Sequence, residues 1–288
     1  PNLTVNYGGG GSGKGRTDLA AGTVNFAGSD SPIPSDETSS FQGKTILYFP
    51  VIVGPITMAY NLSGVSNLKL SPATIAGIFS GKIKTWNDPA IKANNSGVSL
   101  PSTAITLAVR SDSSGTTQNF TEFLVEATGS AWTLGSSSTI KWPSSARAAS
   151  GNPGVAQVVK STPGAIGYVD YSTAKASGLT FASVKNKDGS FIAPSPESAT
   201  AAADSVALKP DLTFAAVWQG GPNAYPITYQ SWDLVNAKQP TAADAANLKA
   251  YLGYLLGDGQ KLLPQIGLAP LPSSLDQKAV AQLDKITS

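Results

Sequence analysis

The sequence predicts an α/β fold of two lobes, and three observations favour it. Segments that read as strands alternate with segments that read as helices, a pattern typical of mainly parallel sheets flanked by helices. The 288 residues exceed what one ordinary core holds, and 41% of them are hydrophobic, enough to bury two cores. No run approaches the roughly 18–20 apolar residues of a membrane span. We therefore expect a globular protein with no transmembrane segment.

Five short segments are predicted to be strands. The first alternates apolar and polar side chains, a period of two that is typical of a half-buried strand. The third is an apolar run, as expected of a strand buried on both faces. The second is followed by Gly28-Ser29-Asp30 and the fourth leads into Arg110, so each is followed closely by a charged residue at its carboxyl end. In chain order the predicted strands are residues 3–7, 23–27, 45–53, 105–109 and 165–169.

Helix starts are marked by capping residues and helix ends by glycine. Ser71 followed by Pro72 is typical of an N-cap with proline at the first helical position, and Gly81 ends that helix. Thr241 with Asp244 three residues later resembles a capping box. In chain order the predicted helices are residues 16–21, 72–79, 113–125, 153–160, 241–257 and 274–286.

Composition excludes several classes of function. The 20 basic and 18 acidic residues nearly balance, and a net charge of +2 without a cluster of Lys and Arg gives no field for nucleic acid. The chain has no Cys and no His, which excludes disulfides, the usual zinc sites, a Cys nucleophile and a Ser-His-Asp triad. We expect neither a metal ion nor a cofactor. Abundant Ser, Thr, Asn, Gly and Ala with few Lys and Glu are typical of an exported protein.

Two stretches share one plan, in which a strand is followed by a Gly/Ser turn and a helix. The first spans residues 7–15 and the second residues 110–117. Such turns leave unpaired N–H groups at a helix N-terminus, where the macrodipole also favours an anion. The second turn adds a cation and hydroxyls from Arg110, Ser114 and Thr116. If the two turns face each other across a cleft, they form a cage for an oxyanion, although a lone glycine-rich turn is often only a tight connection.

Residues 8–14 also fit the G-x-x-x-x-G-K part of a nucleotide-binding P-loop. However, Gly15 stands at the next position, where a P-loop carries the Ser or Thr that holds magnesium. That metal is needed for phosphoryl transfer. The pattern therefore argues against an NTPase.

Asp30 is the most informative charged residue. It follows a strand at the same sheet end as Ser12, so the switch-point rule directs it into the same crevice. A carboxylate repels an anion unless the anion carries a proton to donate, as phosphate does and sulfate at neutral pH does not. An acceptor left unpaired on burial gives roughly 10⁴-fold rejection of the wrong anion. The alternative is that Asp30 only caps the turn at residues 31–32.

Several separate motifs, in the same order, resemble the phosphate-binding receptors of the Pst import system over almost the whole chain. The resemblance implies a type II periplasmic-binding-protein fold, in which two lobes joined by a two-strand hinge close on phosphate. On this basis residues 1–54 with 229–288 form the first lobe, and residues 55–228 form the second. The matching segments are residues 5–7 with the Gly/Ser turn, 22–30 (GTVNFAGSD), 81–89 (GKIKTWNDP), 109–116 (VRSDSSGT), 163–169 (PGAIGYV) and 225–227 (YPI).

The resemblance also implies the ligands of the anion and the setting of the protein. Asp112 would orient the Arg110 guanidinium, and Gly13 would support the first turn. The protein would be a monomeric, extracytoplasmic receptor, in the periplasm or tethered to the outer face of the cytoplasmic membrane. It would deliver phosphate to the permease subunits of an ABC importer and would not be an enzyme. The implied phosphate ligands are Ser12 and Asp30 of the first lobe, and Arg110, Ser114, Gly115 and Thr116 of the second.

One departure from the family and three rival functions accompany this interpretation. Family members begin with another strand, a Thr-Phe-Pro loop and a long first helix, whereas this chain begins at what resembles their second strand. A sulfate or molybdate receptor is the nearest rival, and Asp30 argues against it. A surface or adhesin-like protein of the same fold is a second. An enzyme acting on phosphate esters, which needs a metal or a nucleophile, is a third.

Overall fold

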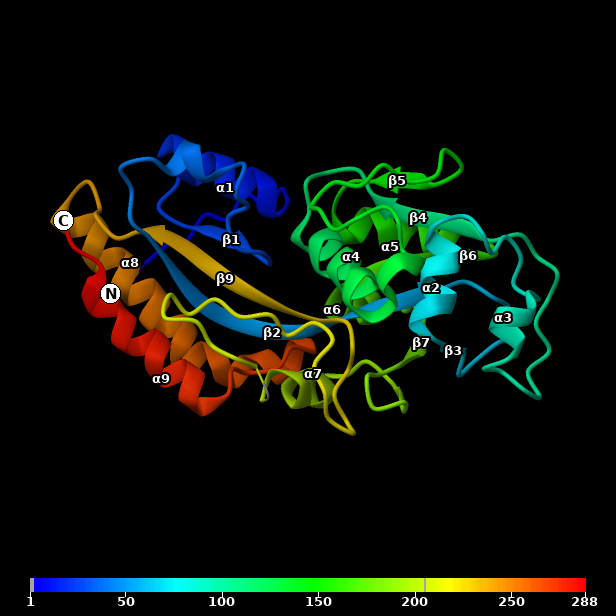
Figure 1. Ribbon diagram of the computed structural model, residues 1–288. Helices are drawn as coiled ribbons and strands as arrows, with labels where there is room; N and C mark the ends of the chain where they lie inside the picture. The colour runs from blue at the N-terminus through cyan, green and yellow to red at the C-terminus, as the bar shows by residue number, and fades with distance from the viewer. Residues whose placement is uncertain (1–2, 205) are drawn as a thin grey trace.

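Two long strands run between the two ends of the molecule and organise the fold (Figure 1). In the computed structural model, which describes residues 3–204 and 206–288, β2 (Ile46–Tyr60) and β9 (Thr228–Asn236) pair antiparallel along most of their shared length. The register shifts directly after Pro50, which has no N–H to give to the ladder. We call the end that holds the two chain termini lobe I and the other end lobe II.

Lobe I contains a three-stranded antiparallel sheet in the order β1-β9-β2, with the short β1 (Ala27–Ser29) at its edge. Its helices are α1 (Gly11–Ala21), α8 (Ala242–Leu256) and α9 (Ser273–Gln282), with 3₁₀ segments η1 (Thr38–Phe41), η3 (Asp258–Ile266) and η4 (Leu283–Lys285). Figure 1 shows α1 on one side of this sheet and α8 and α9 on the other. Phe49, Trp232 and Leu252 lie fully buried between them.

Lobe II contains the sheet path β2-β6-β4-β5, and β7 pairs with β2, β3 and β8. The strands are β3 (Lys69–Leu70), β4 (Thr106–Arg110), β5 (Arg147–Ala149), β6 (Ala165–Asp170), β7 (Thr180–Lys185) and β8 (Phe191–Ile192). The helices are α2 (Pro72–Phe79), α3 (Pro89–Lys92), α4 (Gly115–Thr128), α5 (Gly151–Ser161) and α6 (Tyr171–Ala176), with η2 (Gly129–Ala131). Phe120 stacks on Tyr168 in the core of this lobe, with ring centroids 4.6 Å apart.

The two capping residues predicted from the sequence, Ser71 and Thr241, are confirmed. Ser71 Oγ accepts the Thr74 N–H at 3.2 Å, with Pro72 at the first helical position of α2. Thr241 Oγ1 accepts the Asp244 N–H at 3.1 Å at the start of α8. These bonds satisfy N–H groups that have no partner inside the helix.

The first 30 residues differ from the prediction. Residues 3–10 belong to no helix or strand, so the strand predicted at 3–7 is wrong. Helix α1 begins at Gly11, five residues before the predicted start, and its N-cap Gly10 has φ 116°, in the region that favours glycine. The strand predicted at 23–27 is observed only from residue 27 to 29. Residues 3–7 have the alternating pattern of a strand, but a strand also requires a neighbour with which to pair.

The α/β class and the two-lobed arrangement are confirmed, but parallel pairing is less general than predicted. It joins β4 to β5 and β6, and β3 to β7. The crossing strands β2 and β9 are antiparallel to each of the strands with which they pair. They are antiparallel to each other because the chain passes between the lobes once in each direction.

The boundary between the lobes stays a prediction, and the cores favour one change to it. Helix α7 (Pro196–Ala203) falls within the range predicted for the second lobe. Yet Ala199 and Ala203, with Phe214 further along, pack in the core of lobe I. We therefore propose that residues 196–204 and 206–216 belong with lobe I.

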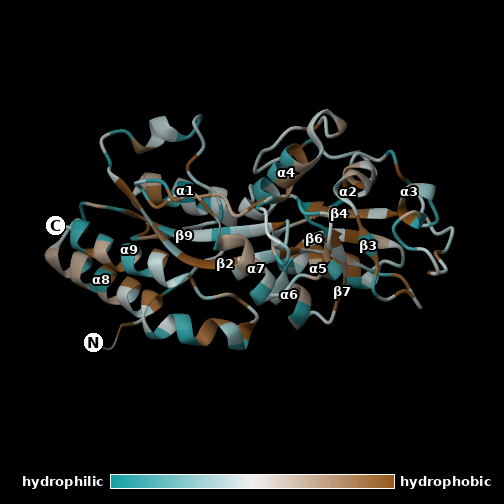
Figure 2. Ribbon diagram, turned by 60° about the horizontal axis from the view of Figure 1, so that its bottom comes forward, coloured by the Kyte–Doolittle hydropathy of each residue, from teal (hydrophilic) through white to brown (hydrophobic). Residues whose placement is uncertain are grey.

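Hydrophilic residues are spread along the outer helices (Figure 2). In α8 and α9, hydrophilic and hydrophobic residues are mixed in the same helix. In the part of the chain that the structure describes, no helix has the length and apolar character needed to cross a membrane.

Candidate functional site

The two predicted anion-binding turns lie against each other where the lobes meet. Gly13 N donates to Ser113 O at 3.2 Å, and Gly115 N donates to Ser12 Oγ at 3.1 Å. Figure 1 shows the first turn of α1, in lobe I, facing α4, in lobe II. These bonds join the two lobes directly, so the arrangement is a closed one.

Ser12 lies in the first turn of α1 rather than in the turn before the helix. Its side chain is buried at 4% exposure. Its Oγ accepts two main-chain N–H groups, from Gly115 at 3.1 Å and from Asp30 at 3.2 Å. The hydroxyl therefore sits between the end of β1 and the start of α4, and still has its own proton to donate.

The start of α4 is built by its own residues. Ser114 is the N-cap, and its Oγ accepts the Thr117 N–H at 3.2 Å. A Cβ atom on Gly115 would lie 2.4 Å from Ser12 Oγ and 2.7 Å from the Asp30 Cβ. Only glycine therefore allows the two lobes to approach this closely.

Arg110, at the end of β4, is held in a fixed orientation. Its Nε donates to Asp112 Oδ1 at 2.8 Å and its Nη2 to Asp112 Oδ2 at 2.5 Å, a bidentate pair. Its Nη1 donates to Thr116 Oγ1 at 3.4 Å. Within the described part of the chain, three of the five guanidinium N–H groups are used in this way, which leaves two for another acceptor. Arg110 is only 8% exposed, so its charge is largely removed from water.

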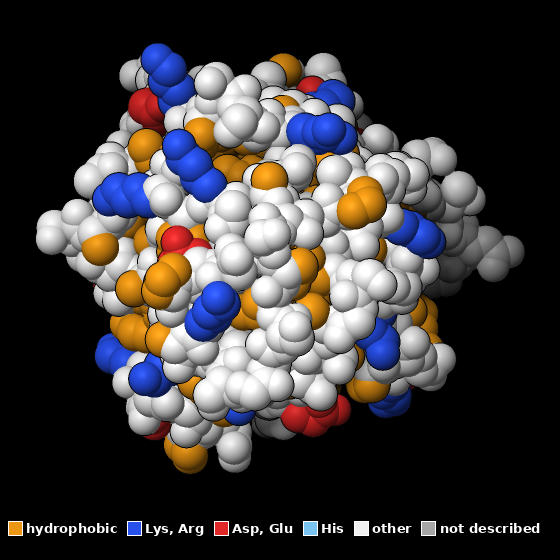
Figure 3. Space-filling model, turned by 90° about the vertical axis from the view of Figure 1, so that its right-hand side faces the viewer, with side chains coloured by type: hydrophobic (Ala, Val, Ile, Leu, Met, Phe, Trp, Pro, Cys, Tyr) orange, Lys and Arg blue, Asp and Glu red, His pale blue; other side chains and the backbone are white. Residues whose placement is uncertain are grey.

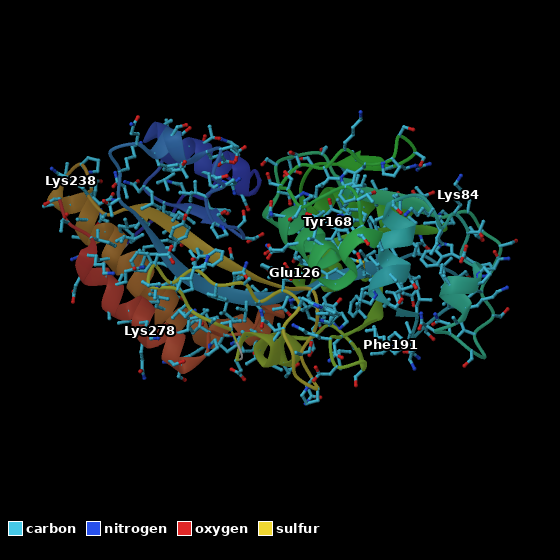
Figure 4. All side chains as sticks on the ribbon, viewed as in Figure 1. Lys84, Glu126, Tyr168, Phe191, Lys238 and Lys278 are labelled. Atoms are coloured by element: carbon cyan, nitrogen blue, oxygen red, sulfur yellow. The ribbon has the colours of Figure 1, made fainter. Side chains whose placement is uncertain are left out.

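Asp112 and Tyr168 complete the support of Arg110. Burial acts to raise the pKa of Asp112, but hydrogen bonds from Arg110 and from Gly151 N, at 3.1 Å, hold that pKa below its ordinary value. Asp112 is therefore the ionised partner of the guanidinium. Tyr168, labelled in Figure 4, accepts the Arg110 N–H at 3.0 Å. Burial raises the pKa of Tyr168 to about 12, so its hydroxyl stays protonated.

Asp30 directly follows β1 and its carboxyl lies in low-dielectric surroundings. Burial raises the pKa of Asp30 to about 6. A hydrogen bond with Ser231 and the charge of Arg110 lower this pKa, whereas the charge of Asp170 raises it. The carboxyl is thus mostly ionised at neutral pH, but its pKa lies much closer to 7 than the pKa of an exposed aspartate.

The structure brings all eight predicted residues together, at two facing helix starts and the strand ends beside them. Asn152, Asp170 and Ser231 are among the neighbours that sequence reasoning missed. Asn152 Nδ2 donates to Thr116 Oγ1 at 3.3 Å, and Asp170 ends β6 and caps α6 through the Thr173 N–H at 2.9 Å. Ser231, on β9, contacts Asp30. The strand-end rule that selected Arg110 could have found Asp170, because parallel strands β4 and β6 end at the same sheet edge.

The nucleotide-binding alternative does not fit this geometry. Lys14 points away from the site and pairs with Asp18 one helical turn later, at 2.5 Å, with 57% of its side chain exposed. Gly15 lies against the main chain of Gly28. Among the residues that the structure describes, no group of three or more acidic side chains is placed to hold a metal ion.

The chain is similar in sequence to phosphate-binding proteins. Residues 1–258 match the family model of the PBP superfamily domain. The phosphate-binding protein PstS 2 of Mycobacterium tuberculosis is 35% identical over 303 aligned residues, covering 100% of this chain and 80% of that protein. The phosphate-binding protein PstS of Pasteurella multocida is 36% identical over 286 residues, covering 96% of this chain and 81% of that protein.

Solved structures show the same fold at lower identity. The periplasmic phosphate-binding protein PfluDING, solved with phosphate bound, gives a TM-score of 0.79 at 21% identity, covering 95% of this chain and 86% of that one. The phosphate-binding protein of Stenotrophomonas maltophilia gives a TM-score of 0.78 at 22% identity, covering 94% and 85%. These likenesses extend over both lobes.

Proposed function

Because this chain belongs to the PBP superfamily and, within it, to the PstS family of phosphate-binding proteins, we propose that it binds inorganic phosphate between its lobes and delivers it to an ABC importer. One observation carries the proposal. Two helix starts from opposite lobes, a buried arginine with unused N–H groups and a carboxyl of raised pKa meet at one point.

Most of the proposed ligands are hydrogen-bond donors. Arg110 supplies the positive charge through its two remaining N–H groups. Ser12, Ser114 and Thr116 supply hydroxyls, and Gly115 supplies the N–H that Ser12 now accepts at 3.1 Å. Phosphate replaces this direct contact, so that each lobe bonds to the anion instead of to the other lobe. Helix N-termini add favourable partial charge on both sides.

Asp30 is the one acceptor in this set, and it provides selectivity. Its carboxylate accepts the proton of hydrogen phosphate, a bond that fully ionised sulfate cannot make. Sulfate would instead leave two negative groups facing each other with no proton between them. The alternative is that Asp30 only caps the turn at residues 31–32. A capping role would not require the raised pKa of Asp30 or its contacts with Ser12 and Ser231.

A binding role is favoured over catalysis. The chain has no His and no Cys, so the hydroxyls at the site lack the usual base that would activate them. The exported setting and the permease partners are part of the proposal and come from the family. Figure 3 shows the end of lobe II, where Lys and Arg side chains are separated by uncharged surface, in agreement with a partner other than nucleic acid.

Calorimetric titration with phosphate, arsenate and sulfate tests the proposal. We expect phosphate and arsenate, which carry the same protons, to compete for one site and sulfate to fail. Binding of sulfate or molybdate in preference to phosphate would favour the rival oxyanion receptor. No anion binding, together with magnesium-dependent hydrolysis of phosphoesters, would favour an enzyme. No anion binding and no hydrolysis would favour a surface protein of the same fold.

A further inference from the structure

Two buried amide side chains next to the site belong to neither helix start. Asn119 lies one turn into α4 and is 2% exposed, and Gln230 lies on β9 and is 3% exposed. Asn119 Nδ2 donates to the main-chain oxygen of Asp30 at 2.6 Å, and Gln230 Nε2 donates to the same oxygen at 3.3 Å. The two amides also bond to each other, from Gln230 Nε2 to Asn119 Oδ1 at 3.0 Å.

Each amide is fully used. The second bond of Asn119 Nδ2 goes to Gly115 O, four residues earlier in α4, at 2.9 Å. The oxygen of Gln230 accepts the Ala216 N–H at 2.8 Å. An amide buried without partners is costly, so such groups are retained where their bonds are completed. Here completion depends on the position of the lobes.

The three parts of this network come from different parts of the molecule. Asn119 moves with lobe II, and the Asp30 carbonyl moves with lobe I. Gln230 lies opposite Val53, at the point where β9 and β2 cross between the lobes. Beside it, a Cβ atom on Gly54 would lie 2.9 Å from the Tyr229 ring. Rotation about this crossing separates Asn119 from the Asp30 carbonyl and breaks the shared bonds.

We propose that Asn119 and Gln230 form a closure latch, and that Asn119 is a positioning residue for the proposed phosphate site. The latch holds the Asp30 peptide by its oxygen. The same residue gives its N–H to Ser12 and its carboxyl to the site. The latch therefore sets the direction of the selectivity carboxyl and links it to the hinge. Its role in phosphate affinity rests on the proposed function, whereas its role in closure does not.

Asn119→Asp tests the latch, because it keeps the shape of the side chain and removes both N–H donors. Asn95 offers a matched control within lobe II. It is 5% exposed, its Nδ2 donates to Lys69 O and Ile91 O, both at 2.8 Å, and its Oδ1 accepts the Lys69 N–H at 2.9 Å. Asn95→Asp thus removes the same number of buried donors away from the cleft.

Two measurements separate the latch from a merely structural role. Without phosphate, small-angle scattering should give a larger radius of gyration for Asn119→Asp than for the wild type and Asn95→Asp. With phosphate, Asn119→Asp should bind at least tenfold more weakly and release the anion faster, while Asn95→Asp stays within about twofold of the wild type. Both variants should melt at lower temperatures than the wild type.

Gln230→Glu provides an independent variant if Asn119→Asp does not fold. It keeps an oxygen for the Ala216 N–H and removes the donors to Asp30 and Asn119. It should change closure and affinity in the same direction as Asn119→Asp. The double variant should be little worse than the weaker-binding single one, because both act on one carbonyl.

The outcomes that overturn the latch differ from those that overturn the proposed function. If the variants at 119 and 230 match Asn95→Asp in radius of gyration and in phosphate affinity, the latch is wrong. If the wild type does not bind phosphate, the proposed function is wrong, and the scattering of the ligand-free proteins still decides on the latch.

Discussion

The two halves of the site are held in place in different ways. In lobe II, Arg110 forms a bidentate ion pair with Asp112, two residues later in the chain, and Ser114 caps α4. In lobe I, α1 begins at Gly11, its N-cap Gly10 offers no side-chain cap, and residues 3–10 belong to no helix or strand. Ser12 instead finds partners in the Asp30 and Gly115 N–H groups, the second of which belongs to lobe II.

This difference suggests that the two lobes contribute differently to binding. The lobe II half is preorganised by neighbours in the sequence, so it can present a charge and a helix start before the anion arrives. The lobe I half takes part of its support from the other lobe, through the Gly115 N–H that Ser12 accepts, and it carries Asp30, the residue proposed to distinguish between anions. We therefore expect substitutions in lobe II to change affinity, and substitutions in lobe I to change selectivity and stability.

The largest effect is expected in the lobe II half. Arg110→Ala should weaken phosphate binding by about 2–5 kcal/mol, because it removes one partner of a buried charge pair and leaves Asp112 without the other. Calorimetry measures this directly. Arg147→Ala, in the next strand of the same sheet but exposed, is the control and should bind as the wild type does. Equal affinities for the two variants would remove Arg110 from the site.

The next effect concerns a buried carboxyl group in lobe I. Asp233, on β9, is 5% exposed, and its Oδ2 has no hydrogen-bond partner among the described residues. Burial raises its pKa from 3.8 to about 7, and the hydrogen bond from Tyr251 only partly opposes this. Burial, and then the charge of Asp233, raise the pKa of Tyr7, so Tyr7 offers this carboxyl no compensating charge. Lobe I thus contains a carboxyl that resists ionisation.

Asp233→Asn should make stability depend less on pH. In the wild type the stabilising effect of the protonated carboxyl is complete below about pH 4 and is lost as the pH rises through about 7. Between pH 5 and 7 the free energy of unfolding should fall by about 1 kcal/mol per pH unit from this group. Denaturant melts of wild type and variant check it, with Asp188→Asn on the exposed β7–β8 turn as control.

Asp30 also makes the free energy of unfolding fall as the pH rises, but over a narrower pH range, since its pKa is raised only to about 6. The double variant at 30 and 233 should therefore be flatter than either single one. A slope that is unchanged in Asp233→Asn would mean that its carboxyl is solvated in the folded protein.

The third prediction concerns selectivity. Asp30→Asn should reduce the preference for phosphate over sulfate by about tenfold or more, because the amide can turn its NH₂ toward a fully ionised oxyanion. Competition titrations with the two anions measure the ratio. In the wild type, phosphate affinity should also fall as the pH drops through about 6, where Asp30 takes up a proton and stops accepting one. An unchanged ratio would favour the turn-capping alternative.

The same contrast explains what the sequence could predict. The support of Arg110 and the cap of α4 join residues two or three positions apart, so the residue types and their spacing carried the signal. By contrast, Ser12 meets Gly115 across 103 positions, and Asn119 meets Asp30 across 89. Such pairs depend on how the lobes close, and a single sequence gives no pattern for that.

The errors in the fold have a related cause. Residues 3–7 have the alternation of a strand, yet in the structure they have no strand with which to pair. The packing of Ala199 and Phe214 in the core of lobe I, on which the proposed change of boundary rests, likewise depends on distant segments rather than on local pattern. Helix α2 was predicted to the residue, because its cap, its first proline and its glycine stop are all local.

The smallest predicted effect separates a cap that serves only its helix from a cap that also serves the site. Ser71 and Ser114 each accept the N–H three residues later at 3.2 Å, the first at α2 and the second at α4. Replacing either by Ala should lower the free energy of unfolding by about 1 kcal/mol. Only Ser114→Ala should also weaken phosphate binding, by about twofold to tenfold, the range for one neutral hydrogen bond. Thermal melts and calorimetry on both variants give the comparison. Equal melting temperatures with equal phosphate affinities would show that Ser114 caps α4 and does not touch the anion, and the lobe II half would then rest on Arg110, Gly115 and Thr116.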